Sequence, residues 1–423
     1  MQVYKFGGAS IATPERMKAL LPIIEEAQKP LLVVVSALGK TTNALEEVVK
    51  TAAKGDLDGA KQMIDALEAD HMNYAKQVLS EDGVKRLKEE LDLFVTEMSW
   101  AVDSAIEQPF DYTYDQIVSV GELMSTTIFS HFLAEQSVKN KWVDARDIIR
   151  TNADYRDGKV DEDFTQKQMT QKVLPLFNQN EVIVSQGFIG CTDENATTTL
   201  GREGSDYSAA LFASMLGAEK VSIWKDVEGL LNADPRLFEE TIKIREISFY
   251  EVIEMSYYGA QVIHPKTIKP LQNKNIPLYV KCFLDRNLEG TVIKNEVDEA
   301  KYPYIIVLKK NQLLLQITTK DFSFVTEHTL RDLYDIFHKY HIKINLLQNA
   351  AISLVVCVDN NEAKIEALLP ALMENYKVLK NTGVELLTVR HYTDEIINEL
   401  TIDKEVLLSQ KSRVTVQAVI KEK

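Results

Sequence analysis

The chain has 423 residues, of which 45% are hydrophobic and 26% are charged. At roughly 100–200 residues per domain this length predicts two or three domains, and the ordinary hydrophobicity excludes a disordered or fibrous chain. Its 48 Lys and Arg residues against 63 Asp and Glu residues give a net charge of -15, which argues against a general polyanion-binding protein. One Lys and a few backbone amides can still form a local phosphate pocket.

The cysteines, the histidines and the first residues exclude further classes of protein. Three widely separated cysteines indicate neither a disulfide framework nor a Cys-rich zinc site: Cys191, Cys282 and Cys357. The histidines form no HxH or HExxH spacing, which gives no support to a metal hydrolase. The N-terminal sequence MQVYKFGG is not typical of a signal peptide, and no apolar run approaches the ~20 residues that a membrane span needs. We therefore expect a soluble, cytoplasmic protein.

The first part of the chain alternates between strand and helix patterns. The predicted elements, in chain order, are a strand at 3–6, a helix at 14–28, a strand at 31–36, a long helical insertion from 42 to about 105, a helix at 121–135, and strands at 182–188 and 221–224. Strands that alternate with helices imply a largely parallel sheet covered by helices, and thus the α/β class. Such sheets bind ligands beyond the C-terminal ends of their strands, where the Gly- and Thr-rich loops of this sequence fall.

A domain boundary is predicted at 295–304, which is charged and contains Pro303. The elements predicted beyond it are a strand at 312–319, a helix at 327–340, strands at 343–349 and 352–359, a helix at 362–375, a strand at 385–392, a short helix near 395–400, and a final segment at 406–420. The order strand, helix, strand, strand, helix is typical of a compact α+β module that binds a ligand or dimerises.

The segment KFGGAS (Lys5–Ser10) follows the first predicted strand and precedes the first predicted helix. Two glycines let a backbone approach an anion closely, the next helix offers unpaired N–H groups, and Lys5 adds positive charge, so this segment can cradle a phosphate. The alternative is a plain turn in which Gly7 and Gly8 only satisfy backbone dihedral angles. The segment matches neither a Walker loop nor GxGxxG.

Two later loops carry hydroxyl and charged residues. VVVSALGKTTNAL (33–45) ends a strand and either lines a polar site or is a solvated loop. TTTLGREGSDYSAA (197–210) combines threonines with one Arg and one Asp at a predicted helix start. Arg202 can hold a carboxylate through two parallel hydrogen bonds. Asp206 either caps the helix or serves a metal–phosphate group.

Three further segments carry candidate residues. VSVGELMS (118–125) places Glu122 at a helix start, where the helix dipole favours a carboxylate, and its functional interpretation is a partner for a substrate ammonium. WKDVEGLLNADPR (224–236) is rich in charge and turns, and it either closes over a nucleotide or is a surface loop. His264 precedes Pro265 and is expected to end a helix rather than to act as an acid or base.

Each signal is weak alone, but their order along the chain is informative. KFGGAS, VVVSA, GE, TTTLGREGSD, WKDVEG…ADPR and GAQVIHPKTI occur here in the order found in aspartate kinases of the amino-acid kinase family, which this chain resembles from residue 5 to about 294. The tail resembles the paired ACT-type regulatory domains of those enzymes. The resemblance implies ATP-dependent phosphorylation of L-aspartate to 4-phospho-L-aspartate, the first step towards lysine, threonine and methionine.

The resemblance also implies roles for individual residues. ATP would be contacted by Lys5, Gly7, Gly8, Ser10, Lys225, Asp226, Arg236 and Gln261. The aspartate pocket would be lined by Ser36, Ala37, Thr42, Glu122, Thr199, Arg202 and Ser205. Glu122 would take the substrate ammonium and Arg202 its α-carboxylate. Lys5 and Asp206 would act in catalysis. The acceptor β-carboxylate is ionised at neutral pH, so positioning and charge neutralisation by Lys5, amides and ATP-bound Mg²⁺ are expected to suffice.

Four positions depart from the family pattern. The family usually has Thr at the position of Ala9, Gly at the position of Glu203 and Lys at the position of Gln261. It often has Tyr at the position of Leu231. The carboxylate of Glu203 would either weaken substrate binding or point to solvent. Lys225 or Lys266 would compensate for the missing lysine at position 261.

The resemblance predicts two regions. They are a catalytic domain at 1–295 with a helical insertion at about 43–108, and an ACT-type region at 304–423 whose second module is shortened (312–384 and 385–423). In such enzymes the effector pocket at the ACT interface takes lysine or threonine, and Asn345 stands near an Asp of lysine-sensitive members. We expect a homodimer through this region, because strands such as 353–358 would otherwise leave an exposed edge.

Two alternative functions stay open. One is a kinase for a related amino acid such as glutamate or N-acetylglutamate, although an acetylated amine cannot pair with the Glu122 carboxylate. The other is a catalytically inactive amino-acid sensor with a kinase-like fold, in which Glu203 and Gln261 would be signs of decay. Against the sensor, the chain has all four of Lys5, Glu122, Arg202 and Asp206, which an active site released from catalysis would not need.

Overall fold

The structure is a computed structural model of the whole chain, and it describes every residue except 261–262. The chain forms two compact units. The first contains residues 1–230, 243–253 and 263–297, and the second contains residues 231–242, 254–260 and 298–423. Between residues 230 and 298 the chain therefore passes from one unit to the other more than once.

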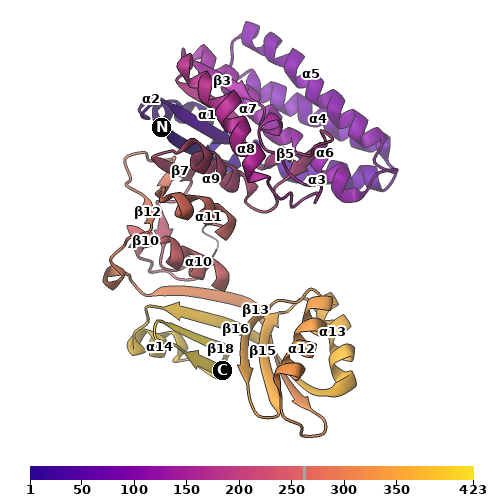
Figure 1. Cartoon of the computed structure of the whole chain (residues 1–423), viewed down its shortest axis with the longest axis vertical. Helices are drawn as coiled ribbons and strands as arrows, with labels where there is room; N and C mark the ends of the chain where they lie inside the picture. The colour runs from indigo at the N-terminus through magenta and orange to yellow at the C-terminus, as the bar shows by residue number, and fades with distance from the viewer. Residues whose placement is uncertain (261–262) are drawn as a thin grey trace. The chain divides into compact units, whose positions relative to one another are not determined.

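The first unit is built on an eight-stranded sheet with the strand order β10-β12-β11-β7-β1-β2-β4-β3 (Figure 1). All neighbouring strands are parallel except β11 and β12, which confirms the predicted, largely parallel sheet. The strands are β1 (Gln2–Phe6), β2 (Leu31–Val35), β3 (Asn140–Val143), β4 (Val182–Gln186), β7 (Lys220–Lys225), β10 (Glu246–Ser248), β11 (Leu278–Cys282) and β12 (Thr291–Lys294). The residues of β1, β2 and β4 are buried along the whole strand, because helices pack against the sheet.

The predicted helix at 14–28 is wrong in its extent. The structure has two short helices instead, α1 (Pro14–Ala19) and α2 (Leu21–Glu25), separated at Leu20. Pro22 explains the break, because a proline lacks the N–H of a continuing helix and its ring clashes with the carbonyl four residues earlier. The predicted cap is confirmed, since the Thr13 side chain accepts a hydrogen bond from the Arg16 N–H at 3.3 Å.

The predicted helical insertion is confirmed as three helices, α3 (Thr41–Ala53), α4 (Leu57–Ala75) and α5 (Glu81–Asp103). They lie together at one flank of the unit, in the violet part of Figure 1. The helices α6 (Phe110–Val118) and α7 (Val120–Glu135) follow. The stretch from Phe110 to Glu135 is long and apolar enough for a membrane span by composition, but 83% of its most apolar window is buried inside the protein. It is therefore a core segment, and α7 packs against β2, β3 and β4.

The remaining elements of this part of the chain are mostly short. They are β5 (Ile189–Cys191), β6 (Thr197–Thr199), β8 (Leu230–Leu231), β9 (Lys243–Ile244), α8 (Glu162–Gln168), α9 (Gly204–Leu216), α10 (Phe249–Tyr258) and α11 (Pro265–Lys274). His264 does not end a helix as expected. It caps the start of α11, where its Nδ1 accepts a hydrogen bond from the Lys266 N–H at 3.2 Å, because Pro265 is well suited to the first helical position.

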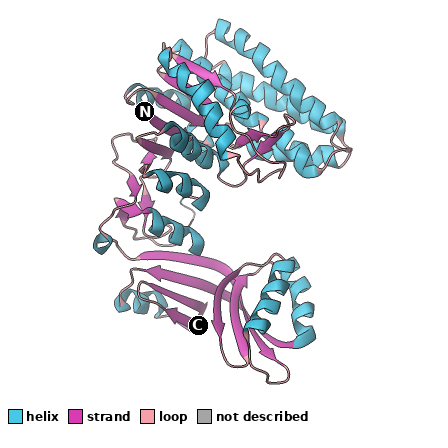
Figure 2. Cartoon of the chain, in the orientation of Figure 1, coloured by secondary structure: helices cyan, strands magenta, loops and turns pink. Residues whose placement is uncertain are grey.

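The second unit contains a six-stranded antiparallel sheet with the order β14-β15-β13-β16-β18-β17. Its elements are β13 (Ile305–Thr319), α12 (Glu327–Lys339), β14 (Ile344–Asn349), β15 (Ser353–Asp359), α13 (Glu362–Asn375), β16 (Tyr376–Arg390), α14 (Asp394–Thr401), β17 (Lys404–Lys411) and β18 (Thr415–Glu422). Figure 2 shows the long curved strands of this sheet beside their helices. The final predicted segment at 406–420 is thus a hairpin of two strands.

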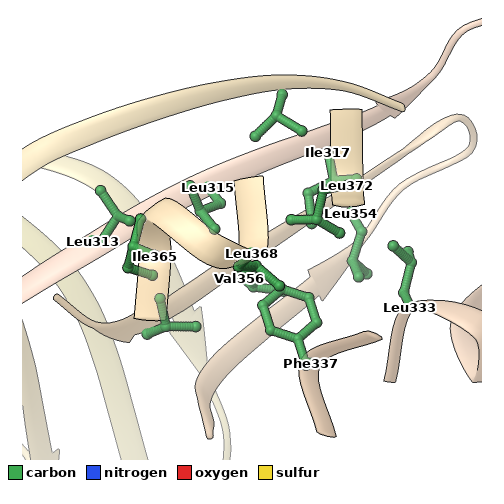
Figure 3. Packing of buried hydrophobic residues seen from close by; sticks show 12 residues of the cluster. Leu313, Leu315, Ile317, Leu333, Phe337, Leu354, Val356, Ile365, Leu368 and Leu372 are labelled. Atoms are coloured by element: carbon green, nitrogen blue, oxygen red, sulfur yellow. The ribbon is translucent and has the colours of Figure 1, made fainter. Parts of the chain in front are cut away.

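Two helices build the main core of this unit on the sheet. Figure 3 shows the apolar side chains that α12 and α13 place against β13 and β15, with Phe337 and Leu368 at the centre. The predicted strands at 312–319 and 385–392 are both too short, since β13 and β16 run for 15 residues each. The first half of β16 is mostly exposed and has no predicted element, and pairing with β13 holds it as a strand.

Candidate active site

The candidate site is a polar cavity of about 510 Å³ in the first unit. It opens beyond the C-terminal ends of β1, β2 and β7, where parallel strands present their loops. The cavity gathers eleven of the residues proposed from the sequence: Lys5, Gly8, Ser36, Ala37, Thr42, Glu122, Thr199, Arg202, Ser205, Asp206 and Lys225. They come from segments spread over 220 positions of the chain, so the tertiary fold alone brings them together.

Buried Lys5 and Asp206 and the partly exposed Lys225 form a charge cluster in the wall of the cavity. The Lys5 Nζ lies 2.6 Å from one Asp206 carboxylate oxygen, and the Lys225 Nζ lies 3.7 Å from the other. Burial by itself would raise the pKa of Asp206, but the ammonium groups of Lys5 and Lys225 outweigh burial and hold that pKa below its usual value. Asp206 is therefore an anion that fixes two cations in place.

The helix-cap interpretation of Asp206 is wrong. Helix α9 begins after Glu203, and Asp206 sits in the first turn with its carboxylate turned to the two lysines. Position in the first turn adds the favourable field of the helix dipole to those ion pairs. The residue therefore belongs to the charge cluster of the cavity.

Glu122 is a second buried carboxylate that lines the cavity. It lies in the first turn of α7, as predicted, and is only 4% exposed. Burial raises its pKa to about 8, and the Ala37 backbone and Lys5 lower it by less. Its Oε2 has no hydrogen-bond partner among the described residues. A buried carboxylate oxygen without a partner is costly, so the site is suited to a cationic group of a ligand.

Several cavity residues have a clear structural reason for their identity. A Cβ atom at Gly8 would lie 2.6 Å from the Ala37 carbonyl oxygen, so glycine is required there by close backbone packing. Neither Gly7 nor Gly8 has a positive φ, so backbone dihedral angles do not explain these glycines, and for Gly8 the reason is close packing. Arg202 is exposed, and its guanidinium makes no hydrogen bond or ion pair with the described part of the chain, which leaves it available for a ligand.

Other candidates lie elsewhere. Gly7 and Ser10 belong to the turn after β1 but do not line the cavity, and the Ser10 hydroxyl donates to the Gly7 carbonyl. Asp226 is exposed on the loop after β7. Arg236 lies in the second unit, where its guanidinium binds the Asp234 carboxylate at 2.7 and 3.0 Å. Gln261 lies outside the described residues.

The structure contradicts one of the two roles considered for Glu203, that of a side chain that points to solvent, and a weakening of substrate binding stays a prediction. Its backbone is left-handed with φ of 54°, a conformation that favours glycine and explains why a glycine is usual there. Its carboxylate lines the cavity, yet it also accepts a hydrogen bond from the His264 N–H at 2.9 Å. Glu203 thus ties the cavity loop to the start of α11 instead of pointing into solvent.

Sequence reasoning missed Asp115, Tyr114 and Arg156. Asp115 is fully buried in α6 and accepts hydrogen bonds from the Thr199 N–H at 2.9 Å, the Thr199 hydroxyl at 2.7 Å and the Arg156 N–H at 2.8 Å. Burial raises the pKa of Asp115 to about 6, and these hydrogen bonds lower it by less. Tyr114 and Arg156 line the cavity. No local pattern marks these residues, because their partners lie 41 and 84 positions away.

Comparisons with known proteins agree with this arrangement. Residues 1–282 match the model of the amino acid kinase family. The chain is 31% identical to lysine-sensitive aspartokinase 3 of Escherichia coli over 361 residues, which is 84% of this chain and 78% of that protein. It is 33% identical over 298 residues to a bifunctional aspartokinase/homoserine dehydrogenase of Daucus carota, of which it covers 32%.

A solved structure shows the same fold. The crystal structure of E. coli aspartokinase III in complex with aspartate and ADP has a TM-score of 0.82 and 26% sequence identity, and the match covers 100% of this chain and 96% of that one. The likeness therefore extends over both units. The chain belongs to the amino acid kinase family and, within it, to the aspartokinases.

Proposed function

We propose that this protein is an aspartate kinase, which transfers the γ-phosphoryl group of ATP to the β-carboxylate of L-aspartate and forms ADP and 4-phospho-L-aspartate. One observation carries the proposal. A single cavity holds a buried carboxylate with an unpartnered oxygen, on Glu122, together with the Lys5–Asp206–Lys225 cluster. The first feature suits an amino acid's ammonium group, and the second suits a transferring phosphoryl group.

The charges of aspartate suggest which cavity residues bind each of its groups. Glu122 pairs with the ammonium, and Arg202 holds the α-carboxylate through its free guanidinium. Polar and small residues line the remaining wall: Ser36, Ala37, Thr42 and Ser205. Thr199 contributes its side chain less directly, because its hydroxyl already donates to Asp115.

The phosphoryl half needs charge neutralisation rather than a base. The β-carboxylate is already ionised at neutral pH, so no proton has to be removed before it attacks phosphorus. Lys5 meets the negative charge of the phosphates, and Asp206 keeps Lys5 and Lys225 at fixed positions. Gly7, Gly8, Ser10, Asp226, Arg236 and Gln261 remain our candidates for further contacts to ATP.

Mg²⁺ fits this site as a companion of ATP. The described residues contain no group of three or more His, Cys, Asp or Glu side chains that could hold a metal ion. Mg²⁺ keeps few protein ligands and is commonly bound through substrate phosphates, and when bound it neutralises phosphate charge. Asp206, which lies between Lys5 and Lys225, is our candidate carboxylate for a contact with this ion.

Glu122 also favours aspartate kinase over the alternatives. An acetylated amine could not form an ion pair with this carboxylate, which disfavours N-acetylglutamate. An inactive sensor would have no use for the Lys5–Asp206 ion pair in the same cavity. Glutamate would place its reacting carboxylate one methylene further from Glu122, so a direct comparison of acceptors decides between the two.

The test is ADP release with ATP and Mg²⁺, with L-aspartate, L-glutamate or no acceptor. We expect ADP release only when L-aspartate is the acceptor. The rate of this release should fall by at least about 100-fold in Lys5→Ala and in Asp206→Ala. Lys220→Ala is the matched control and should retain activity, because Lys220 is at the other end of β7 and does not line the cavity. Full activity in both cavity variants would refute the site, and folded protein without aspartate-dependent ADP would favour the sensor.

The second unit is proposed to regulate the enzyme. We assign to it two ACT-type modules, the second one shortened, which bind lysine or threonine as effector and mediate a homodimer of this cytoplasmic enzyme. A relative that is named lysine-sensitive supports this proposal. Repeating the ADP assay with each amino acid, and measuring the molar mass by light scattering, tests both parts.

A further inference from the structure

Arg156 is a cation at the cavity that none of the sequence motifs contains, unlike Lys5, Arg202 and Lys225. It lies in the turn of a hairpin-like segment between Thr151 and Val160, which are paired by an isolated antiparallel bridge. Its side chain lines the same cavity as Glu122 and Arg202.

The main chain of Arg156 is fixed by residues of the cavity wall. Its backbone is left-handed with φ of 67°, and its N–H donates to the buried Asp115 carboxylate at 2.8 Å. The same carboxylate accepts two hydrogen bonds from Thr199. The next turn is fixed too, because the Gly158 N–H donates to the Thr199 carbonyl at 2.9 Å. Arg156 therefore keeps a constant position relative to β6.

Arg156 and Arg202 come from two loops in direct contact. A Cβ atom at Gly201 would lie 3.2 Å from the Arg156 carbonyl oxygen and 2.9 Å from the Asp157 carboxylate. Only glycine therefore allows the loop that carries Arg202 to approach the turn that carries Arg156 this closely. Two guanidinium groups thus border neighbouring parts of one cavity.

The contacts of the Arg156 side chain orient its guanidinium and still allow it to bind a ligand. Its guanidinium lies 4.4 Å from the centre of the Tyr114 ring, and the Tyr114 hydroxyl is itself fixed by a 2.7 Å hydrogen bond to Glu46. Its ion pair is with Asp111 at 3.0 Å, and the two side chains are 46% and 59% exposed. Exposed ion pairs of this kind contribute little stability, so a bound carboxylate can replace Asp111.

We propose that Arg156 binds the α-carboxylate of the acceptor amino acid together with Arg202, and that it exchanges its ion pair with Asp111 for this contact. The Tyr114 ring provides a flat surface on which the guanidinium turns from one carboxylate to the other. This inference rests on the proposed function, because it names a further residue of the same acceptor site.

The test compares two variants for which a binding role and a structural role predict opposite results. Arg156→Gln removes the cation, and Asp111→Asn removes its competing partner while leaving Arg156 free. If Arg156 binds the acceptor, Arg156→Gln raises the KM for aspartate by about 10- to 100-fold, and Asp111→Asn leaves that KM unchanged or lowers it. The KM for ATP stays the same in both. Arg156→Lys should recover part of the loss, because it keeps the charge but not the fork of donors.

Lys159→Gln is the matched control for long-range charge. Lys159 is on the same segment, is 75% exposed, pairs with Asp154 at 2.9 Å and does not line the cavity, so this variant should behave as wild type. An equal rise of the aspartate KM in Arg156→Gln and Asp111→Asn would overturn the proposal and assign a structural role to the ion pair. An unchanged KM in Arg156→Gln would overturn it as well.

Wild-type turnover with aspartate is measured first and decides the proposed function separately. If the wild type binds aspartate without turnover, the same variants are compared by dissociation constants from calorimetry, with the same expected ratios. If the wild type neither binds nor converts aspartate, both proposals fall together. If it turns over aspartate and Arg156→Gln does so with the same KM, only the inference about Arg156 falls.

Discussion

The burial of Glu122 leads to a quantitative prediction about protons. Burial raises the pKa of Glu122 from 4.5 to about 8, so at pH 7 roughly nine-tenths of the free protein carries the protonated acid. An ammonium group pairs with the carboxylate and not with the acid, so binding of aspartate at pH 7 is expected to release about 0.9 proton. The dissociation constant should likewise fall about ninefold from pH 6 to pH 7, because the ionised fraction rises by that factor.

Calorimetry on nucleotide-free protein measures this release directly. Aspartate is titrated at pH 7 in two buffers with different ionisation enthalpies, and the difference in heat gives the number of protons. Glu122→Gln is the control, because an amide has the same shape and does not ionise in this range. We expect weaker binding in this variant, no proton release, and no change of affinity between pH 6 and pH 7.

A wild type that binds aspartate with no proton release and with the same affinity at pH 6 and pH 7 would refute this reasoning. Glu122 would then either be ionised before the ligand arrives or have no contact with the ammonium. Proton release that persists in Glu122→Gln would assign the titration to another group. Asp115 is another buried carboxyl group near the cavity, and burial raises its pKa to about 6, whereas the pKa of Asp206 is lowered.

Two further predictions concern stability. His71 is 2% exposed and burial lowers its pKa, so the folded state prefers the neutral ring and should lose stability as the pH falls below about 6.5. In His71→Phe the difference in Tm between pH 7.5 and pH 5.5 should therefore be smaller than in the wild type. An unchanged Tm difference would contradict this prediction. Glu203→Ala removes the acceptor of the His264 N–H and should cost about 1 kcal/mol in urea unfolding, whereas Glu203→Gln keeps an acceptor and should unfold like wild type. Equal losses in both variants would show that the charge, and not the hydrogen bond, matters.

Local sequence patterns determined much of the first unit. The apolar runs at β1, β2 and β4 are long enough and β-branched enough to require buried strands, and the helices between them impose parallel pairing. The position of Glu122 in the first turn of a helix follows from the residues around it. Such features depend on neighbours within a few positions, so the sequence alone carries them.

Only the tertiary structure decided what the charged residues do. Asp206 has the sequence context of a helix cap, but Lys5 and Lys225 reach it from two different strands and make it the centre of an ion-pair cluster. In the sequence, Arg156 is one charged residue in a turn. In the structure, its hydrogen bond to the Asp115 carboxylate and the close approach of Gly201 place it beside the loop that carries Arg202. These contacts join residues far apart in the chain, and their energies depend on burial and distance, which no local pattern contains.

The polar first half of β16 makes the same point for the fold. The residues from Tyr376 to Gly383 are mostly exposed, and half of them are Lys, Asn or Gly, types that are depleted in strands, so no strand is predicted there. Pairing with β13 supplies the backbone hydrogen bonds that hold them in an extended conformation. The sequence alone therefore determined the apolar periodicity and the order of the motifs, whereas non-local pairing decided where strands end and which charges meet.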